Sequence, residues 1–251
     1  MGKTPIIIKI VNNSQIYRAL ASRNFEYFGE FDLNIIIVGG GGHGRVIIDI
    51  VEKFGQFNLL GILDAQLPLG TDVLGYEVLG SEGDLIKLIV ERQVEGVVIA
   101  VGDNWIRSKS TSSILFAVPH IAFPNVIHPA AQVGKSVCLG HGNVVMAGAV
   151  INSGATIGNF CILNTNCSVD HDVILGDYVS FAPNSCAGGS VEVGDYSAVC
   201  LGSNIIDRIR IGSHTVIGSG STVLHEMPAN IVAFGTPACK IRDRSAGDKY
   251  L

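Results

Sequence analysis

One feature constrains the fold of this 251-residue chain more than any other: an apolar residue returns at every sixth position from Ile127 to Val223. No insertion interrupts the series, although only 47% of the chain is apolar. A period of six belongs to neither an α-helix nor a single β-strand, so it marks an internal structural repeat. The anchors are Ile127, Val133, Leu139, Val145, Ile151, Ile157, Leu163, Val169, Leu175, Phe181, Ala187, Val193, Val199, Ile205, Ile211, Ile217 and Val223.

A small residue usually follows four positions after each anchor, as in Ala131, Cys161 and Ser197. One large and one small inward residue per hexad fit a narrow interior, and three hexads make one triangular coil. Parallel pairing between coils would satisfy the backbone and bury the anchors. Glycines directly after several anchors are expected to turn the corners with positive φ. They are Gly134, Gly140, Gly158, Gly176, Gly188, Gly194, Gly212 and Gly218. The pattern leaves the hand of the coils open, because parallel crossovers are usually right-handed.

An α/β unit precedes the repeat. A buried strand over residues 34–38 runs into a glycine-rich loop and then into a helical pattern. Gly39, Gly41 and Gly44 fit G-x-G-x-x-G, whose bare amides can face an anionic group at a helix N-terminus. A second strand ends at Asp64, where a carboxylate can accept a bond from a ribose or base. We expect one bound nucleotide, because the unit is small for a dinucleotide; a tight turn with no ligand is the alternative.

Composition excludes several classes of protein. The formal net charge is −5 with no basic stripe, which argues against nucleic acid. No run of about 18 apolar residues is present to span a membrane. Six cysteines without a C-x-x-C pair indicate reduced thiols, no metal and a cytoplasmic protein. Residues 1–33 lack the features of a signal peptide, and the sequence assigns them no role.

One histidine of the repeat stands between two acids, in Asp170-His171-Asp172. His171 comes two positions after an anchor, so its side chain should point outward from a coil. An exposed imidazole titrates near neutrality and can act as a base, and a carboxylate on one ring nitrogen would fix its tautomer. The alternative is a histidine that is merely solvated.

In combination, these motifs resemble those of the bacterial nucleotide-sugar N-acetyltransferases, which are hexapeptide-repeat acyltransferases with sialic acid O-acetyltransferases as near relatives. The resemblance covers about residues 34–244 and lies in the segments 38–44, 100–104, 164–172 and 235–238. It implies an α/β Rossmann-like domain followed by an all-β left-handed parallel β-helix. The expected divisions are an extension (1–33), a sugar-nucleotide domain (34–124), the β-helix (125–226) and a tail on the CoA side (227–251).

The resemblance also implies a reaction and its residues. Acetyl-CoA, as cosubstrate, would acetylate the amino group, expected to be the 4-amino group, of a nucleotide-linked sugar. His171 would be the general base, Asp172 its partner acid, Gly189 an amide donor to the thioester oxygen and Asn164 a polar contact. The expected CoA contacts are Gly189, Pro237, Lys240 and Arg242. The expected sugar-nucleotide contacts are Gly39, Gly41, Gly42, His43, Gly44, Asp64, Asn104 and Arg107.

The same resemblance implies a homotrimer with sites between subunits. One departure is Ser180, which stands where some members have a second histidine. Three other functions stay open: O-acetylation of a free sugar such as sialic acid, a zinc hydratase, and a non-enzymatic sugar-nucleotide sensor or scaffold. The hydratase needs converging histidines, but Gly176 stands where a second one would follow His171.

Overall fold

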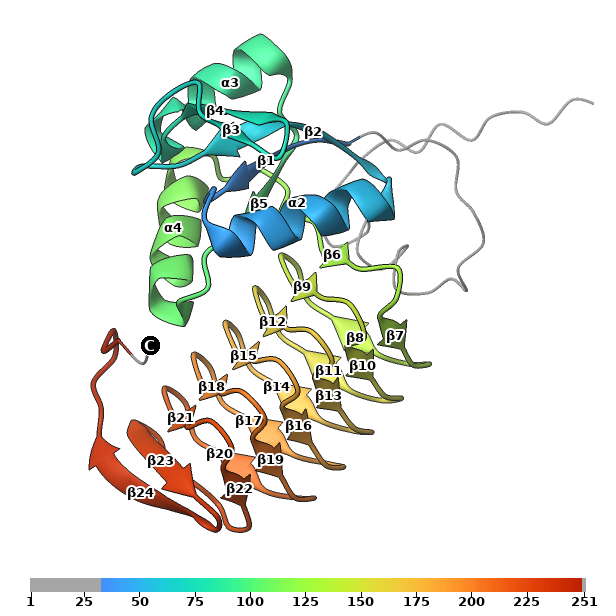
Figure 1. Cartoon of the computed structure of the whole chain (residues 1–251), viewed down its shortest axis with the longest axis vertical. Coiled ribbons are helices and arrows are strands. Elements are labelled where there is room, and N and C mark those ends of the chain that lie inside the picture. Colours follow the sequence, from blue (N-terminus) through green and yellow to red (C-terminus); the bar gives the residue numbers. More distant parts are fainter. Residues whose placement is uncertain (1–32, 250–251) are drawn as a thin grey trace, which may run out of the picture.

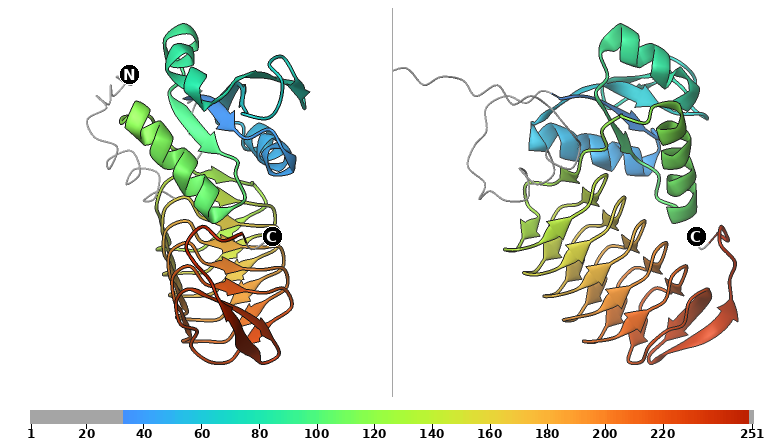
Figure 2. Two further views of the ribbon diagram at one scale, coloured as in Figure 1. Left: turned by 90° about the vertical axis from the view of Figure 1, so that its left-hand side faces the viewer. Right: turned by 180° about the vertical axis from the view of Figure 1, so that it is seen from behind.

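The computed structural model describes residues 33–249, so the extension assigned to residues 1–33 lies outside the described residues apart from Leu33. An α/β domain sits at one end of a three-sided column of short strands (Figure 1). A hairpin closes the other end of the column, and the chain then returns toward the α/β domain (Figure 2).

The α/β domain is built on a five-stranded sheet of order β3-β4-β2-β1-β5. All neighbouring pairs are parallel except the β3–β4 hairpin. The strands are β1 (Leu33–Val38), β2 (Phe57–Leu63), β3 (Asp72–Val73), β4 (Tyr76–Gly80) and β5 (Gly96–Ile99). The helices are α2 (Gly42–Phe54), α3 (Leu85–Arg92), which follows the 3-10 turn η1 (Glu82–Asp84), and α4 (Asn104–Ala117). The predicted strand, glycine loop and helix therefore occur in the predicted order.

Seventeen two-residue strands, β6 to β22, form the column, one for each hexad. They make three parallel sheets in which each strand pairs with the strand 18 residues away. The first sheet holds β6 (Val126–Ile127), β9 (Val144–Val145), β12 (Ile162–Leu163), β15 (Ser180–Phe181), β18 (Ala198–Val199) and β21 (Val216–Ile217). The second holds β7 (Gln132–Val133), β10 (Val150–Ile151), β13 (Ser168–Val169), β16 (Cys186–Ala187), β19 (Asn204–Ile205) and β22 (Thr222–Val223).

The third sheet holds β8 (Cys138–Leu139), β11 (Thr156–Ile157), β14 (Ile174–Leu175), β17 (Glu192–Val193) and β20 (Arg210–Ile211). The antiparallel hairpin of β23 (Ile231–Gly235) and β24 (Ala238–Asp243) extends the first sheet through a parallel pairing of β21 with β23. This addition covers the last edge of that sheet, whose unpaired N–H and C=O groups would otherwise be open.

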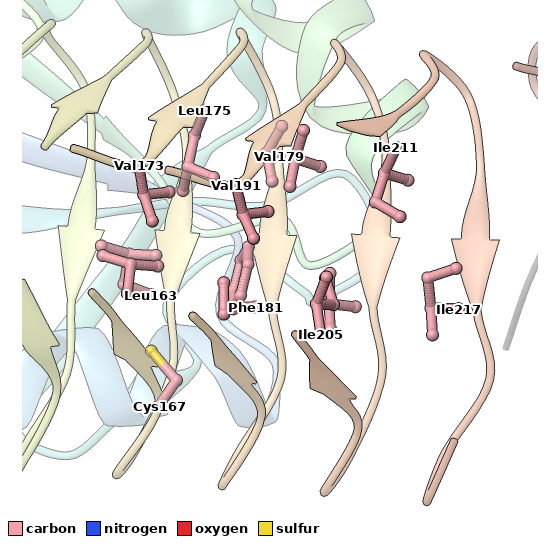
Figure 3. Close-up of a cluster of buried hydrophobic side chains, with 14 of the residues drawn as sticks. Leu163, Cys167, Val173, Leu175, Val179, Phe181, Val191, Ile205, Ile211 and Ile217 are labelled. Carbon is pink, nitrogen blue, oxygen red and sulfur yellow. The ribbon is translucent and has the colours of Figure 1, made fainter. Parts of the chain in front are cut away.

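The hexad anchors fill the centre of the column (Figure 3). All anchors from Val145 to Val223 are buried in one cluster, while Ile127, Val133 and Leu139 of the first coil are partly buried. Hydroxyl groups at the smaller inward positions bond to the backbone of the column: Ser197 and Ser203 donate to the carbonyls of Gly212 and Gly218. These two buried hydroxyl groups are thereby satisfied.

The prediction that glycines after the anchors supply positive φ is wrong. Positive φ falls three residues after an anchor and is adopted mostly by other residues, such as Phe160, Asn166 and Asp172 at 54° to 58°. The glycines are needed for space instead. A Cβ on Gly158 would lie 2.6 Å from the carbonyl carbon and oxygen of Gly176 in the next coil. Hydrogen-bonded coils approach too closely at this point for a side chain.

Candidate functional site

Three corners run along the column, and each stacks its turn residues at an interval of 18 residues. We call them the His171 corner (Ser153, His171, Gly189 and Asp207), the aromatic corner (Phe160, Tyr178, Tyr196 and His214) and the asparagine corner (Asn164 to Asn166, with Asn184 one coil beyond Asn166). The first joins the second and third sheets, the next joins the third and first, and the last joins the first and second.

His171 lies on the His171 corner between β13 and β14, and its side chain is 61% exposed. Its Nδ1 lies 2.9 Å from Oδ2 of Asp172. Strand alternation would turn these adjacent residues apart, but Asp172 has a left-handed φ of 58°, which brings its carboxylate back to the ring. The carboxylate on Nδ1 favours the tautomer whose unprotonated Nε2 can take a proton.

The surroundings of His171 make it more basic. The hydrogen bond to Asp172 raises the pKa of His171 above its usual value, and the charges of Asp170, Asp172 and Asp207 add to this. Partial desolvation of the ring lowers the pKa of His171, but the hydrogen bond and the three charges outweigh it. Asp170 is itself held in place, because its Oδ1 accepts from Asn152 Nδ2 and from the N–H of His171, both at 2.7 Å.

Gly189 lies against the His171 ring, one coil further along. A Cβ at this position would be 2.6 Å from Cε1 and from Nε2 of His171, so the missing side chain leaves room for the imidazole. The N–H of Gly189 was predicted to bond to a thioester oxygen. It instead donates to Oδ1 of Asp207 at 3.1 Å. The prediction of a free, pre-aimed amide is therefore corrected: the next coil supplies an acceptor that the family pattern did not reveal.

Asn164 lies on the asparagine corner, separated from His171 by the width of the second sheet. Its Oδ1 accepts from the N–H of Thr165 at 2.8 Å. Within one chain the two predicted site residues are therefore not brought together. They do share one coil, since β12 precedes Asn164 and β13 precedes His171.

The glycine loop leads from β1 into the first turn of α2. Gly39 has φ 108°, and a Cβ there would lie 2.7 Å from the carbonyl oxygen of Ala100. Gly41 and Gly42 are exposed, with nothing close to the position of a side chain. A Cβ on Gly44 would collide with the carbonyl of Gly39. The loop thus presents bare backbone at a helix N-terminus, which suits an anionic group.

Asp64 at the end of β2 holds this loop. Its carboxylate accepts from the N–H groups of Gly40, Gln66 and Leu67 at 2.7, 2.8 and 3.0 Å. Partial burial alone would raise the pKa of Asp64, but these three donors outweigh it and hold the pKa below the ordinary value. A nucleoside bonded to Asp64, as predicted, would have to share this carboxylate with the three backbone N–H groups of the loop.

His43 is the first side chain of α2 that turns inward. Burial, and secondly the charge of Arg107, lower the pKa of His43 to about 4. The ring is therefore neutral at physiological pH. Its Nε2 is buried without a hydrogen-bond partner among residues 33–249.

Asn104 and Arg107 were predicted to contact the sugar nucleotide, but they are buried, at 2% and 1% exposed, where α4 meets the column. Arg107 donates to the carbonyls of Phe160, Val101, Gly102 and Tyr178 at 2.9 to 3.2 Å. Asn104 donates to the carbonyls of Tyr196 and Ser197 at 3.3 and 3.1 Å. These predictions are wrong, because the side chains join the two domains and face no open surface.

Ser180 belongs to the same junction. Its hydroxyl donates to Oδ1 of Asn104 at 2.6 Å, and Arg107 Nη2 donates to it at 3.2 Å. The serine that departs from the family pattern therefore lies on the first sheet, away from the His171 corner. Its departure does not alter the surroundings of His171 within the chain.

Apart from Gly189, the residues predicted to meet CoA lie in the terminal hairpin. Pro237 is in the turn between β23 and β24. Lys240 pairs with Asp243 at 2.6 Å, and Arg242 donates to the carbonyl of Asp243 at 3.1 Å. Arg242 is also 3.8 Å from Asp248. Both basic side chains therefore have local partners.

Two further observations concern residues 33–249. They contain no group of three or more His, Cys, Asp or Glu side chains arranged to hold a metal ion. None of their helices combines the length and the apolar character that crossing a bilayer would need.

Comparison with known proteins identifies the class. Residues 34–114 match the PglD N-terminal domain family. The structure of perosamine N-acetyltransferase from Caulobacter crescentus, solved as a histidine variant with CoA and GDP-perosamine, is 35% identical, covers 84% of this chain and 97% of that chain, and gives a TM-score of 0.78. The acetyltransferase domain of PglB from Neisseria gonorrhoeae, in complex with acetyl coenzyme A, is 28% identical over 84% and 100% of the two chains, with a TM-score of 0.76.

A third relative is UDP-N-acetylbacillosamine N-acetyltransferase from Bacillus subtilis (strain 168). It is 34% identical over 116 residues, which are 45% of this chain and 51% of that protein, so the match spans about half of its length.

These matches confirm the predicted fold class, an α/β domain on a left-handed β-helix of the acyltransferase type. The chain belongs to the nucleotide-sugar N-acetyltransferase family. It is therefore an acetyl-CoA-dependent N-acetyltransferase.

A substitution of Arg107 tests its role at the junction. Arg107→Ala would remove one donor from Asn104 and one from each of several buried carbonyl oxygens, so we expect a loss of about 3 kcal/mol and a melting temperature about 10 °C lower. Arg45→Ala, which removes an exposed arginine from α2, serves as the control and should melt like the wild type. An unchanged melting temperature with weaker sugar-nucleotide binding would instead favour the original prediction.

The role of Asp172 is open to titration. Because its hydrogen bond and charge raise the pKa of His171, Asp172→Asn should lower that pKa, and His171 should lose its proton at lower pH than in the wild type. NMR titration of the His171 ring protons measures this shift directly. A pKa that stays in place or rises would show that the carboxylate is not bound to the ring in solution.

Proposed function

We propose that this chain transfers the acetyl group of acetyl-CoA to the amino group, specifically the 4-amino group, of a nucleotide-linked sugar. The observation that carries the proposal is the exposed pair of His171 and Asp172, 2.9 Å apart on the surface of an acyltransferase β-helix. The amine nitrogen attacks the thioester carbon, the carbon–sulfur bond breaks, and CoA leaves as the thiol. The relatives solved with CoA and GDP-perosamine support the two substrates.

His171 is the base in this reaction. Its Nε2 takes the proton of the attacking amine and returns it to the sulfur of the departing CoA, while Asp172 on Nδ1 stabilises the imidazolium that forms in between. The base works in its neutral form, so activity should rise with pH through the pKa of His171. That relatives were solved with a substituted histidine and both ligands bound supports a reaction centred on one histidine.

The active unit in this proposal is a homotrimer with its sites between subunits. A threefold axis parallel to the column places the same coil of each subunit at the same height. His171 and Asn164 share one coil, so His171 of one subunit lies at the height of Asn164 in its neighbour. The partner subunit's Asn164 could then reach the site from its asparagine corner, although within one chain it cannot.

In this proposal each domain has a separate role. Residues 34–124 bind the sugar nucleotide through Gly41 and Gly42 of the loop, with His43 neutral beside it. Residues 125–226 carry the transfer, and residues 227–251 lie on the CoA side, with Pro237, Lys240 and Arg242 near the cosubstrate. All six cysteines are free, which supports a reducing compartment, the cytoplasm.

Thiol release tests this function. The protein is incubated with acetyl-CoA and a panel of UDP- and GDP-linked 4-amino sugars, with free sialic acid as a separate acceptor. Release with a nucleotide-linked amino sugar supports the proposal. Equal release with sialic acid would favour O-acetylation of a free sugar. Calorimetry that detects sugar-nucleotide binding but no CoA binding would favour a sensor or scaffold.

His171→Ala should reduce kcat by about 10²-fold or more, because it removes the proton acceptor. The same thiol assay measures the loss. His120→Ala is the matched control, since His120 is an exposed histidine that follows α4 and should be dispensable. Near-normal turnover in the His171 variant would remove this residue from the mechanism.

A further inference from the structure

Asp207 is a charged side chain of the His171 corner that the proposed reaction leaves unused. It lies two coils beyond His171, and its Oδ1 accepts the N–H of Gly189 at 3.1 Å. A Cβ on Gly188 would collide with this same oxygen, so the two glycines of the turn make room on both sides. One of them admits the Asp207 carboxylate, and the other admits the His171 imidazole.

The same contact recurs on the aromatic corner, away from His171. The N–H groups of Asn159 and Asp177 donate to Oδ1 of Asp177 and Asp195 at 2.7 and 2.8 Å. The N–H of His141 donates to Oδ1 of Asn159 at 3.1 Å. An acid or an amide at this position thus ties down the turn of the preceding coil, and the chain itself uses an asparagine once.

At His171 the pattern is interrupted. Gly189 has no side chain to accept the N–H of His171, which donates to its neighbour Asp170 instead. The freed space is filled by the imidazole, whose Cε1 and Nε2 face the turn of Gly189. Asp207 holds the turn of Gly189, so the position of the backbone against which the ring packs depends on this carboxylate.

We propose that Asp207 is a positioning residue for acetyl transfer: its carboxylate holds the N–H of Gly189 and thereby fixes the turn 188–190 against the reactive edge of His171. This inference rests on the proposed function, since it takes His171 to be the base. The negative charge of Asp207 also favours the protonated ring. The other charges acting on His171 are those of Asp170 and Asp172 in its own turn. The turn of the preceding coil, Asn152-Ser153-Gly154, carries no charged side chain.

Two variants separate the effect of the accepting oxygen of Asp207 from the effect of its negative charge. Asp207→Asn keeps an oxygen for the N–H of Gly189, as Asn159 does for His141, but removes the charge. Asp207→Ala removes both. Asp195→Asn is the matched control, because it removes the same charge from the same kind of contact on the other corner. Melting temperatures of all three variants check that the column is folded.

The readouts are kcat and the pH profile of kcat/KM from thiol release, and the His171 titration by NMR. Asp207→Ala should lower kcat about 10-fold or more, because small displacements of reacting groups are costly. Asp207→Asn should stay within about 2-fold of the wild-type kcat on the alkaline plateau, while its acid limb and the His171 titration move to lower pH. Asp195→Asn should change none of these.

Three results would overturn the inference: turnover in Asp207→Ala that is unchanged or faster, an Asp207→Asn variant as impaired as the alanine variant, or equal losses in Asp195→Asn. The titration needs no turnover. If the wild type released no thiol with any acceptor, the proposed function would fail. A His171 titration that shifts in Asp207→Asn but not in Asp195→Asn would still show that Asp207 acts on the ring.

Discussion

The pairing of each coil with the next in a fixed register of 18 residues is the constraint from which the rest of this structure follows. Ser168 pairs with Val150 on one side and Cys186 on the other, and no bulge interrupts the pairing from β6 to β22. Parallel strands lie about 4.8 Å apart, so every outward side chain meets the residues 18 positions before and after it. The surroundings of a corner residue are therefore set largely by its counterparts in the neighbouring coils.

The register also decides how the α/β domain is attached. On the aromatic corner, Phe160, Tyr178, Tyr196 and His214 stack nearly parallel with ring centroids 4.6 to 5.2 Å apart. Trp105 of α4 packs its edge against Tyr196, while Arg107 and Asn104 bond to carbonyls of the same corner. The domain is thus fixed by contacts to successive coils, and the junction is ordered because the column is regular.

The sequence predicted the features that depend on spacing along the chain. The anchors, the strand positions of the column and the outward His171 were readable from periodicity, and the strand before the glycine loop was readable from its composition. The contact of His171 with Asp172 was not, because it depends on a left-handed φ. Arg107 was misread because its partners lie 53 and 71 residues away. Asp207 was missed, although a signal existed: Gly140, Gly158 and Gly176 each precede by 19 residues an Asn or Asp that accepts from the turn.

The central claim is that this register seats the imidazole of His171 in the space left by Gly189. The most direct measurement is kcat together with a crystal structure for Gly189→Ala. Gly189 is not in the left-handed region, so alanine fits the backbone, but its Cβ would lie 2.6 Å from Nε2. We predict a displaced ring and a kcat lowered by about 10²-fold, with the column intact. The account would be contradicted if the turn that carries the alanine methyl moved instead, His171 stayed in place and kcat was normal.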